Sequence, residues 1–346
     1  MKLRVLYLCV LAIALVWGSR LLGKGQSSAP QAQQAAPAPA DTASVRLNVD
    51  LVVLDAQVLQ KKTSRIVGGL QKTDFTLVED GVKQDILQFS KDTLPLSVIL
   101  LVDRGGCLDP FGDKVRNATI EALNRLRPQD EVAVMAFATD TTLVKGFRLV
   151  RNATADALDR LPPHDERAGH CFNRAFYDAA HFMREASNPA GRRVIIMITG
   201  ITKTFDCPPP TSSETRDEVL ESGAVVCGLI PQTGEQRFEN GIISSAASVA
   251  GMFKTPTSSL KQFVEETGGE IFTAKPDVLD RAFETMVDHL RSRYTIGYVS
   301  SNTRRDGTYR KVRVQISPDV QKREGDLTVS TRRGYLAPKD NRAQVH

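Results

Sequence analysis

The amino-acid sequence predicts an α/β protein with a doubly wound, mainly parallel sheet and flanking β segments before and after it. Two observations support this fold class. Between residues 95 and 293, apolar runs of strand length alternate with segments in which apolar residues recur at helical spacing. The flanking segments, 45–94 and 294–338, alternate apolar and polar residues with a period of two, which is typical of antiparallel strands. Strands that alternate with helices favour a sheet covered by helices on both faces.

The composition is that of a soluble globular protein, with 41% hydrophobic and 25% charged residues. The formal net charge is +5, but the basic residues are scattered in short groups such as residues 291–293. We expect these groups to be solvated, and we expect no nucleic-acid partner, because nucleic-acid binding requires a massed basic patch.

The first 25 residues have the pattern of a signal peptide or an N-terminal anchor. A basic start at residues 1–4 precedes an apolar run at residues 5–18, which is short for a membrane span. Residues 26–44 are rich in Ala, Gln and Pro, which predicts a flexible linker. We therefore expect an exported protein, periplasmic or secreted, with residues 5–18 available as a tether to the inner membrane.

Residues 45–94 predict a small β module. Residues 45–59 form an alternating strand pattern, and residues 73–90 have the order strand, Asp-Gly turn, strand, which indicates a hairpin. The tail, 294–338, predicts further strands at 294–301, 309–317 and 326–338. We hypothesise that the two β segments pack together into one module.

The α/β domain, 95–293, is predicted to begin with the strand 94–103, whose unbroken apolar run indicates burial on both faces. Pro128 stops the first helix, and Gly223 and Gly268 end later ones. The other predicted strands are 130–139, 142–150 (a short edge strand), 191–201, 224–231 and 270–274. The predicted helices are 111–128, 152–163, 170–186, 213–223, 258–269 and 277–293.

A family pattern is carried by residues 74–90, 97–103, 127–137, 191–199, 263–269, 293–316 and 331–338. The pieces include "SVILLVD", "RPQDEVAVMAF" and "TRRGYLAP". Over residues 45–338 the chain resembles the von Willebrand factor type A domains, in particular a secreted bacterial branch known as the VWFA-related acidobacterial family. The resemblance implies a central sheet between helices, with a metal-ion-dependent adhesion site at the carboxyl ends of the strands.

The family's adhesion site uses Asp-x-Ser-x-Ser after the first strand, a Thr in a later loop and an Asp after the fourth strand. These hard oxygen ligands suit Mg²⁺. This chain keeps the first aspartate as Asp103, but it has Gly105 and Cys107 at the serine positions and Gly200 at the later aspartate position. We therefore expect the usual Mg²⁺ site to be degenerate, with no metal or other cofactor.

The loops at this site are rich in cysteine. At the threonine position the alignment leaves His170 and Cys171 as alternatives. Because the loops that carry Cys107, Cys171 and Cys207 converge in the family's fold, and export favours oxidation, we expect a disulfide to replace the metal. The preferred pairing is Cys107–Cys171 and the second is Cys171–Cys207. Cys227 lies in an apolar strand and is predicted to be a buried free thiol.

The predicted function is non-enzymatic binding of an unidentified protein or cell-envelope partner by the loop face around Asp103, His170 and Cys171. One alternative is a zinc-dependent binding or redox site built from Cys107, His170 or Cys171, and Cys207. A hydrolase with a Cys–His–Asp triad is a further alternative. The chain has no Gly-x-Ser-x-Gly motif, P-loop or GxGxxG after a strand, so the sequence favours no enzyme class. A purely structural envelope protein is the remaining possibility.

Overall fold

The computed structural model describes residues 50–91, 93–108, 112–149, 156–165, 168–189, 191–204, 207–232 and 258–339. The predicted signal peptide or anchor, 1–25, and the predicted linker, 26–44, lie outside the described residues. Among the helices that are described, none is both long enough and apolar enough to cross a membrane.

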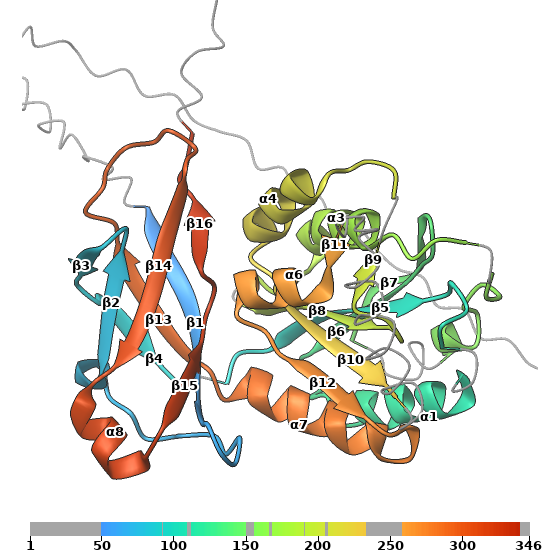
Figure 1. Ribbon diagram of the computed structural model, residues 1–346, viewed down its shortest axis with the longest axis horizontal. Helices are drawn as coiled ribbons and strands as arrows, with labels where there is room; N and C mark the ends of the chain where they lie inside the picture. The colour runs from blue at the N-terminus through green and yellow to red at the C-terminus, as the bar shows by residue number, and fades with distance from the viewer. Residues whose placement is uncertain are drawn as a thin grey trace, which may run out of the picture. The chain divides into compact units, whose positions relative to one another are not determined.

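A six-stranded sheet in the order β12-β10-β8-β5-β6-β7 forms the centre of the α/β domain (Figure 1). Its neighbouring strands are parallel, except that the edge strand β7 runs antiparallel to β6. This confirms the predicted fold class, and the edge position of β7 confirms the prediction for 142–150. The strands are β5 (Leu96–Asp103), β6 (Glu131–Phe137), β7 (Thr141–Arg148), β8 (Arg192–Ile198), β10 (Val225–Pro231) and β12 (Ile271–Ala274).

The strand order has a switch point between β5 and β8. From β5 the chain moves through β6 to β7 at one edge, and then returns to β8 on the other side of β5. In open α/β sheets the loops beyond the carboxyl ends of the strands separate at such a point and form the usual binding crevice. The ends of β5 and β8 therefore mark the place where a functional site is expected.

Helices cover both faces of the central sheet (Figure 1). On one face the buried side chains of α1 and α7 pack against Val98, Leu100 and Val102 of β5. On the other face those of α3, α4 and α6 pack against Ile99 and Leu101. All eight residues of β5 are buried, as the unbroken apolar run predicts. The helices are α1 (Gly112–Leu123), α3 (Phe172–Phe182), α4 (Ser212–Ser222), α6 (Leu260–Thr267) and α7 (Leu279–Arg291).

The β segments before and after the α/β domain pair with each other in two four-stranded sheets. In the first, β15-β1-β13-β4, β1 runs antiparallel to β13. In the second, β16-β14-β2-β3, β14 runs antiparallel to β2. Residues of both sheets share one apolar core, so the two segments form one β module, as hypothesised. The strands are β1 (Leu51–Gln60), β2 (Phe75–Glu79), β3 (Val82–Gln84), β4 (Gln88–Ser90), β13 (Tyr294–Val299), β14 (Tyr309–Ile316), β15 (Leu327–Ser330) and β16 (Gly334–Leu336).

Local sequence explains the hairpin but not every element. The predicted Asp-Gly turn joins β2 to β3, with positive φ angles of 46° at Asp80 and 88° at Gly81. The first helix ends at Leu123, before the predicted stop at Pro128. The pattern also missed α8 (Pro318–Glu324) and the short pair of β9 (Lys203–Thr204) with β11 (Ser258–Ser259). Three 3₁₀ turns are also described: η1 (Lys72–Asp74), η3 (Met183–Glu185) and η4 (Pro276–Val278).

Candidate functional site

Asp103 is the centre of the candidate site, at the last position of β5. Its side chain is 0% exposed, and four groups converge on its carboxylate. The backbone N–H of Gly105 donates to Oδ1 at 2.9 Å, and the hydroxyl of Thr199 donates to Oδ2 at 2.6 Å. The Cys107 thiol donates to Oδ2 at 3.2 Å, and Nδ1 of His170 lies 2.9 and 3.0 Å from the two oxygens.

The topology brings these residues together from three parts of the chain. Thr199 directly follows β8, which is the parallel neighbour of β5 at the switch point. His170 lies just before α3, beside the carboxyl end of β6 (the backbone N–H of Cys171 donates to the Ala138 carbonyl at 2.8 Å). The cluster therefore occupies the crevice that the strand order predicts.

His170 supplies the positive charge in this cluster. Its hydrogen bond to Asp103 raises the pKa of the imidazole above its ordinary value of 6.5, against the opposing effect of burial. The charged imidazolium in contact with both oxygens acts as an internal counter-ion for a carboxylate that has no access to water. A buried carboxylate without a cation would be strongly destabilising.

Gly105 is required by the position of His170. A Cβ atom at residue 105 would lie 2.5 Å from Cε1 and 2.6 Å from Nδ1 of the imidazole, too close for real atoms. A serine at this position would therefore displace His170. The absence of a side chain at residue 105 and the position of the His170 imidazole are therefore sterically linked.

Cys107 and Gly200 form a second matched pair. A Cβ atom at residue 200 would lie 2.6 Å from the carbonyl oxygen of Cys107, so an aspartate there would move the loop. The Gly200 N–H donates to the Cys107 sulfur at 3.2 Å. Burial and the nearby Asp103 charge raise the pKa of the Cys107 thiol to about 12. Cys107 therefore stays protonated and acts as a hydrogen-bond donor to Asp103.

The disulfide joins Cys171 to Cys207, with a Cα–Cα distance of 5.5 Å. The preferred pairing, Cys107–Cys171, is wrong because the Cys107 sulfur is directed to Asp103 and Thr199; the second pairing is the one found. Cys107 and Cys227 are free, and Cys227 is 1% exposed, as predicted for a buried thiol. His170, not Cys171, is the residue that contacts Asp103.

The side chains at this site fit Mg²⁺ poorly. They include one carboxylate, a protonated thiol and an imidazole, whereas Mg²⁺ requires several hard oxygen ligands in octahedral geometry. The zinc set proposed from the sequence fails in part, because Cys171 and Cys207 are bonded to each other. Ligand atoms of Asp103, Cys107 and His170 do lie within 4.8 Å of one another.

Thr199 is the site residue that the sequence reasoning missed. It is fully buried and donates the shortest hydrogen bond to Asp103. Its position was available as a signal, because it directly follows a buried strand at the same sheet edge and precedes Gly200. The family pattern drew attention to the neighbouring aspartate position instead.

Searches for related proteins give structural neighbours only. No protein-family model matches the chain, and no curated protein matches it. A von Willebrand factor type A structure from Catenulispora acidiphila is 12% identical, with 86% of this chain and 76% of that one covered and a TM-score of 0.41. The von Willebrand factor domain of the pilus tip protein Mfa5 from Porphyromonas gingivalis is 9% identical, with coverages of 57% and 95% and a TM-score of 0.38.

A further neighbour comes from the mussel byssus. Proximal thread matrix protein 1 from the mussel byssus is 14% identical over 60% of this chain, with a TM-score of 0.40. The match spans 49% of that protein, so this chain corresponds to about half of its length. The fold assignment rests on the strand order and register described above.

Proposed function

We propose that this chain is an exported, non-enzymatic interaction protein on a von Willebrand type A-like scaffold, of the kind found in the VWFA-related acidobacterial family. In this proposal the loop face at the switch point binds a protein or cell-envelope partner without Mg²⁺. One observation carries it: His170 occupies both oxygens of Asp103, the carboxylate that holds the metal in the family.

The loop face is supported by covalent and ionic contacts that do not depend on a metal. The Cys171–Cys207 disulfide spans a sequence separation of 36 residues and holds the start of α3 against the loop that follows β9. Closing a loop of this size stabilises the fold by about 4 kcal/mol in the chain-entropy model. The ion pair of His170 and Asp103 fixes the adjacent loop, so the surface is preorganised for a partner.

The chemistry of Cys107 supports a binding role over catalysis. A nucleophilic cysteine needs a lowered pKa or an adjacent base. The pKa of Cys107 is raised to about 12, and Nδ1 of His170 is directed to Asp103. The hydrolase alternative would require both groups to rearrange.

Metal titration tests the proposal. We expect Mg²⁺ and Mn²⁺ at millimolar concentration to give no binding heat and no increase in Tm. The matched positive control carries G105S, C107S, H170T and G200D, which restores the family's ligand types. Tight Mg²⁺ binding by the unaltered protein would contradict the proposal, and so would partner capture from envelope extract that is abolished by EDTA.

Zinc binding is the second candidate, favoured by the cluster of Asp103, Cys107 and His170. Three donors of these types suit a zinc site with an open fourth position. Native mass spectrometry after gentle purification distinguishes the two candidates, because a zinc adduct that is lost in H170A would support the second.

Export is proposed from residues 1–25 and is tested by determining the N-terminus of the mature protein after cell fractionation.

A further inference from the structure

β7 forms one edge of the central sheet and pairs only with β6 among the described residues. The strand is eight residues long, and Leu143 is 47% exposed on it. An edge strand of this length presents a row of unpaired backbone N–H and C=O groups. Such an edge can accept an additional strand from another chain.

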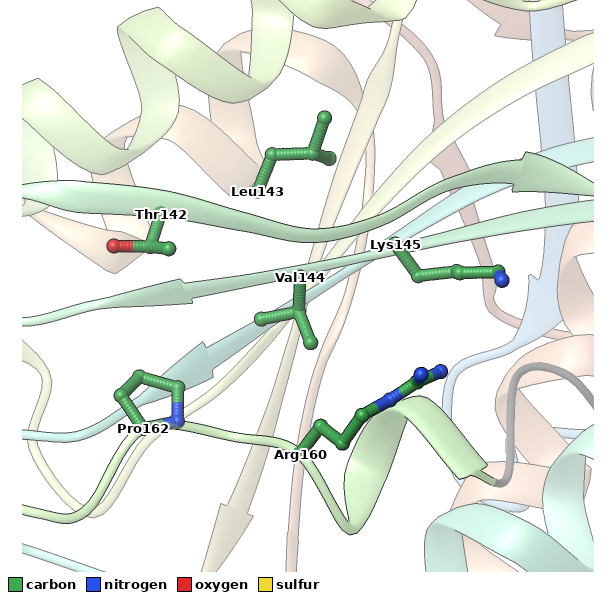
Figure 2. A pocket seen from close by; sticks show the side chains of 6 residues that line it. All are labelled: Thr142, Leu143, Val144, Lys145, Arg160 and Pro162. Atoms are coloured by element: carbon green, nitrogen blue, oxygen red, sulfur yellow. The ribbon is translucent and has the colours of Figure 1, made fainter.

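A hollow lies on each face of β7. The first has a volume of about 400 Å³ and is lined by Thr142, Leu143, Val144, Lys145, Arg160 and Pro162 (Figure 2). Nε of Arg104 donates to the Pro162 carbonyl at 2.7 Å, which fastens the far wall to the end of β5. The second hollow has a volume of about 330 Å³. Met135, Leu143 and Phe182 form its apolar part, and its other lining residues are Thr141, Asp178, His181, Arg184 and Glu185.

A β-bulge in β7 determines which of its side chains point toward each hollow. Val134 of β6 lies opposite Lys145 and the next residue, Met135, lies opposite Leu143, so Val144 is an extra residue on β7. As a result Val144 and Lys145 line the first hollow together. Leu143 points to the opposite side of the strand from Val144 in Figure 2.

The first hollow carries two cationic side chains, Lys145 and Arg160. Within the described residues, neither Lys145 nor Arg160 makes an ion pair, whereas the nearby Arg116 pairs with Asp159. Figure 2 shows the Lys145 and Arg160 side chains extending toward the same end of the hollow, beside Val144. The two cations are complementary to a carboxylate, and the apolar surface beside them is complementary to apolar side chains of the same peptide segment.

We propose that β7 binds an extended segment of a partner protein in which acidic and apolar residues alternate. The segment pairs with the regular end of β7, Thr141–Leu143, and places a carboxylate between Lys145 and Arg160. Because successive side chains of a strand point to opposite faces, the neighbouring apolar side chain enters the second hollow against Leu143 and Phe182. This inference goes beyond the proposed function, because it assigns a partner chemistry to a surface other than the Asp103 cluster.

The test uses a fluorescein-labelled peptide of alternating glutamate and valine, as long as β7, with fluorescence anisotropy as the readout. We expect it to bind the full chain, and we expect binding to weaken by at least about tenfold when glutamine replaces glutamate. A peptide of the same composition, with the glutamates in one block and the valines in another, should bind equally weakly. Free glutamate at high concentration should not compete, which separates an extended segment from a simple carboxylate ligand.

The matched variants are K145E/R160E, which changes the two cations of the first hollow, and K62E/K83E, which changes the charge equally at two exposed positions away from it. Only the first should weaken binding, again by at least about tenfold; K145Q/R160Q provides the same test if the double reversal fails to fold. Absence of binding, equal binding of the glutamine or block peptide, or unchanged binding by K145E/R160E would overturn the proposal. H170A should bind the peptide normally, so failure here leaves the proposed role of the loop face standing.

Discussion

Replacing His170 with alanine removes the cation from the buried carboxylate of Asp103. The Asp103 side chain is 0% exposed and that of His170 is 23% exposed. Breaking a fully buried ion pair costs about 3–5 kcal/mol, and the partial exposure of the histidine reduces this, so we expect H170A to lower the free energy of unfolding by about 2–3 kcal/mol near pH 6.

The cost should depend on pH in a defined direction. The pKa of His170 is raised above 6.5 in the folded protein, so folding favours its protonated form. Such a group contributes stability that is fully present below the unfolded-state pKa and is lost as the pH rises through the folded-state pKa. H170A should therefore be most destabilising near pH 6 and less so near pH 9, because its cost falls as the wild-type imidazole loses its proton with rising pH.

Urea unfolding followed by circular dichroism, with the disulfide oxidised, measures the change in free energy of unfolding at each pH. H181A is the matched control, because that side chain is 67% exposed beside Glu218, and its replacement should change the stability by less than about 0.5 kcal/mol. In a D103N background H170A should cost little, since a neutral amide needs no counter-ion. An equal cost at both pH values, or no cost at pH 6, would refute the counter-ion role of His170.

Three further outcomes are expected from the same cluster. G105S should destabilise by about 1–3 kcal/mol through contact with the imidazole, and this cost should vanish in the H170A background, as urea unfolding would show. Replacing Cys171 and Cys207 together with serine should lower the stability by about 4 kcal/mol, and unreduced peptide mapping of the native protein should recover the two as a linked pair. Cys107 should be alkylated by iodoacetamide at pH 8 far more slowly in the native than in the urea-unfolded protein, because its pKa is about 12; equal rates by mass spectrometry would contradict this.

The elements with strong local signals were predictable. The β5 strand has an apolar run that is buried on both faces, and the Asp80–Gly81 turn adopts positive φ angles that few other residue pairs tolerate. The edge position of β7 followed from its mixed polar and apolar sequence. Helix α8 was missed because its residues 318–324 are mostly polar and only Val320 is buried.

The arrangement of the site could be predicted only in part. The family pattern identified Asp103, Gly105, Cys107 and Gly200, because these positions have fixed spacing from buried strands. The cysteine pairing depends on the direction of the Cys107 sulfur, which a hydrogen bond to Asp103 decides. The spacing of residues in the sequence does not encode that contact. It also does not reveal that the position of His170 requires glycine at residue 105.

The pairing of β1 with β13 has a mechanical consequence. The register runs from Leu51 opposite Val299 to Ala56 opposite Tyr294, and β13 begins directly after α7. Consider a force that pulls on the chain before Leu51 while a partner holds the α/β domain. The force acts on β1 at Leu51 and on β13 at Tyr294, which lie at opposite ends of the β1–β13 ladder. The hydrogen bonds are then sheared together and not opened one at a time. Tension is transmitted through this short ladder, and the longer covalent path from β1 to β5 carries little of it while the ladder holds.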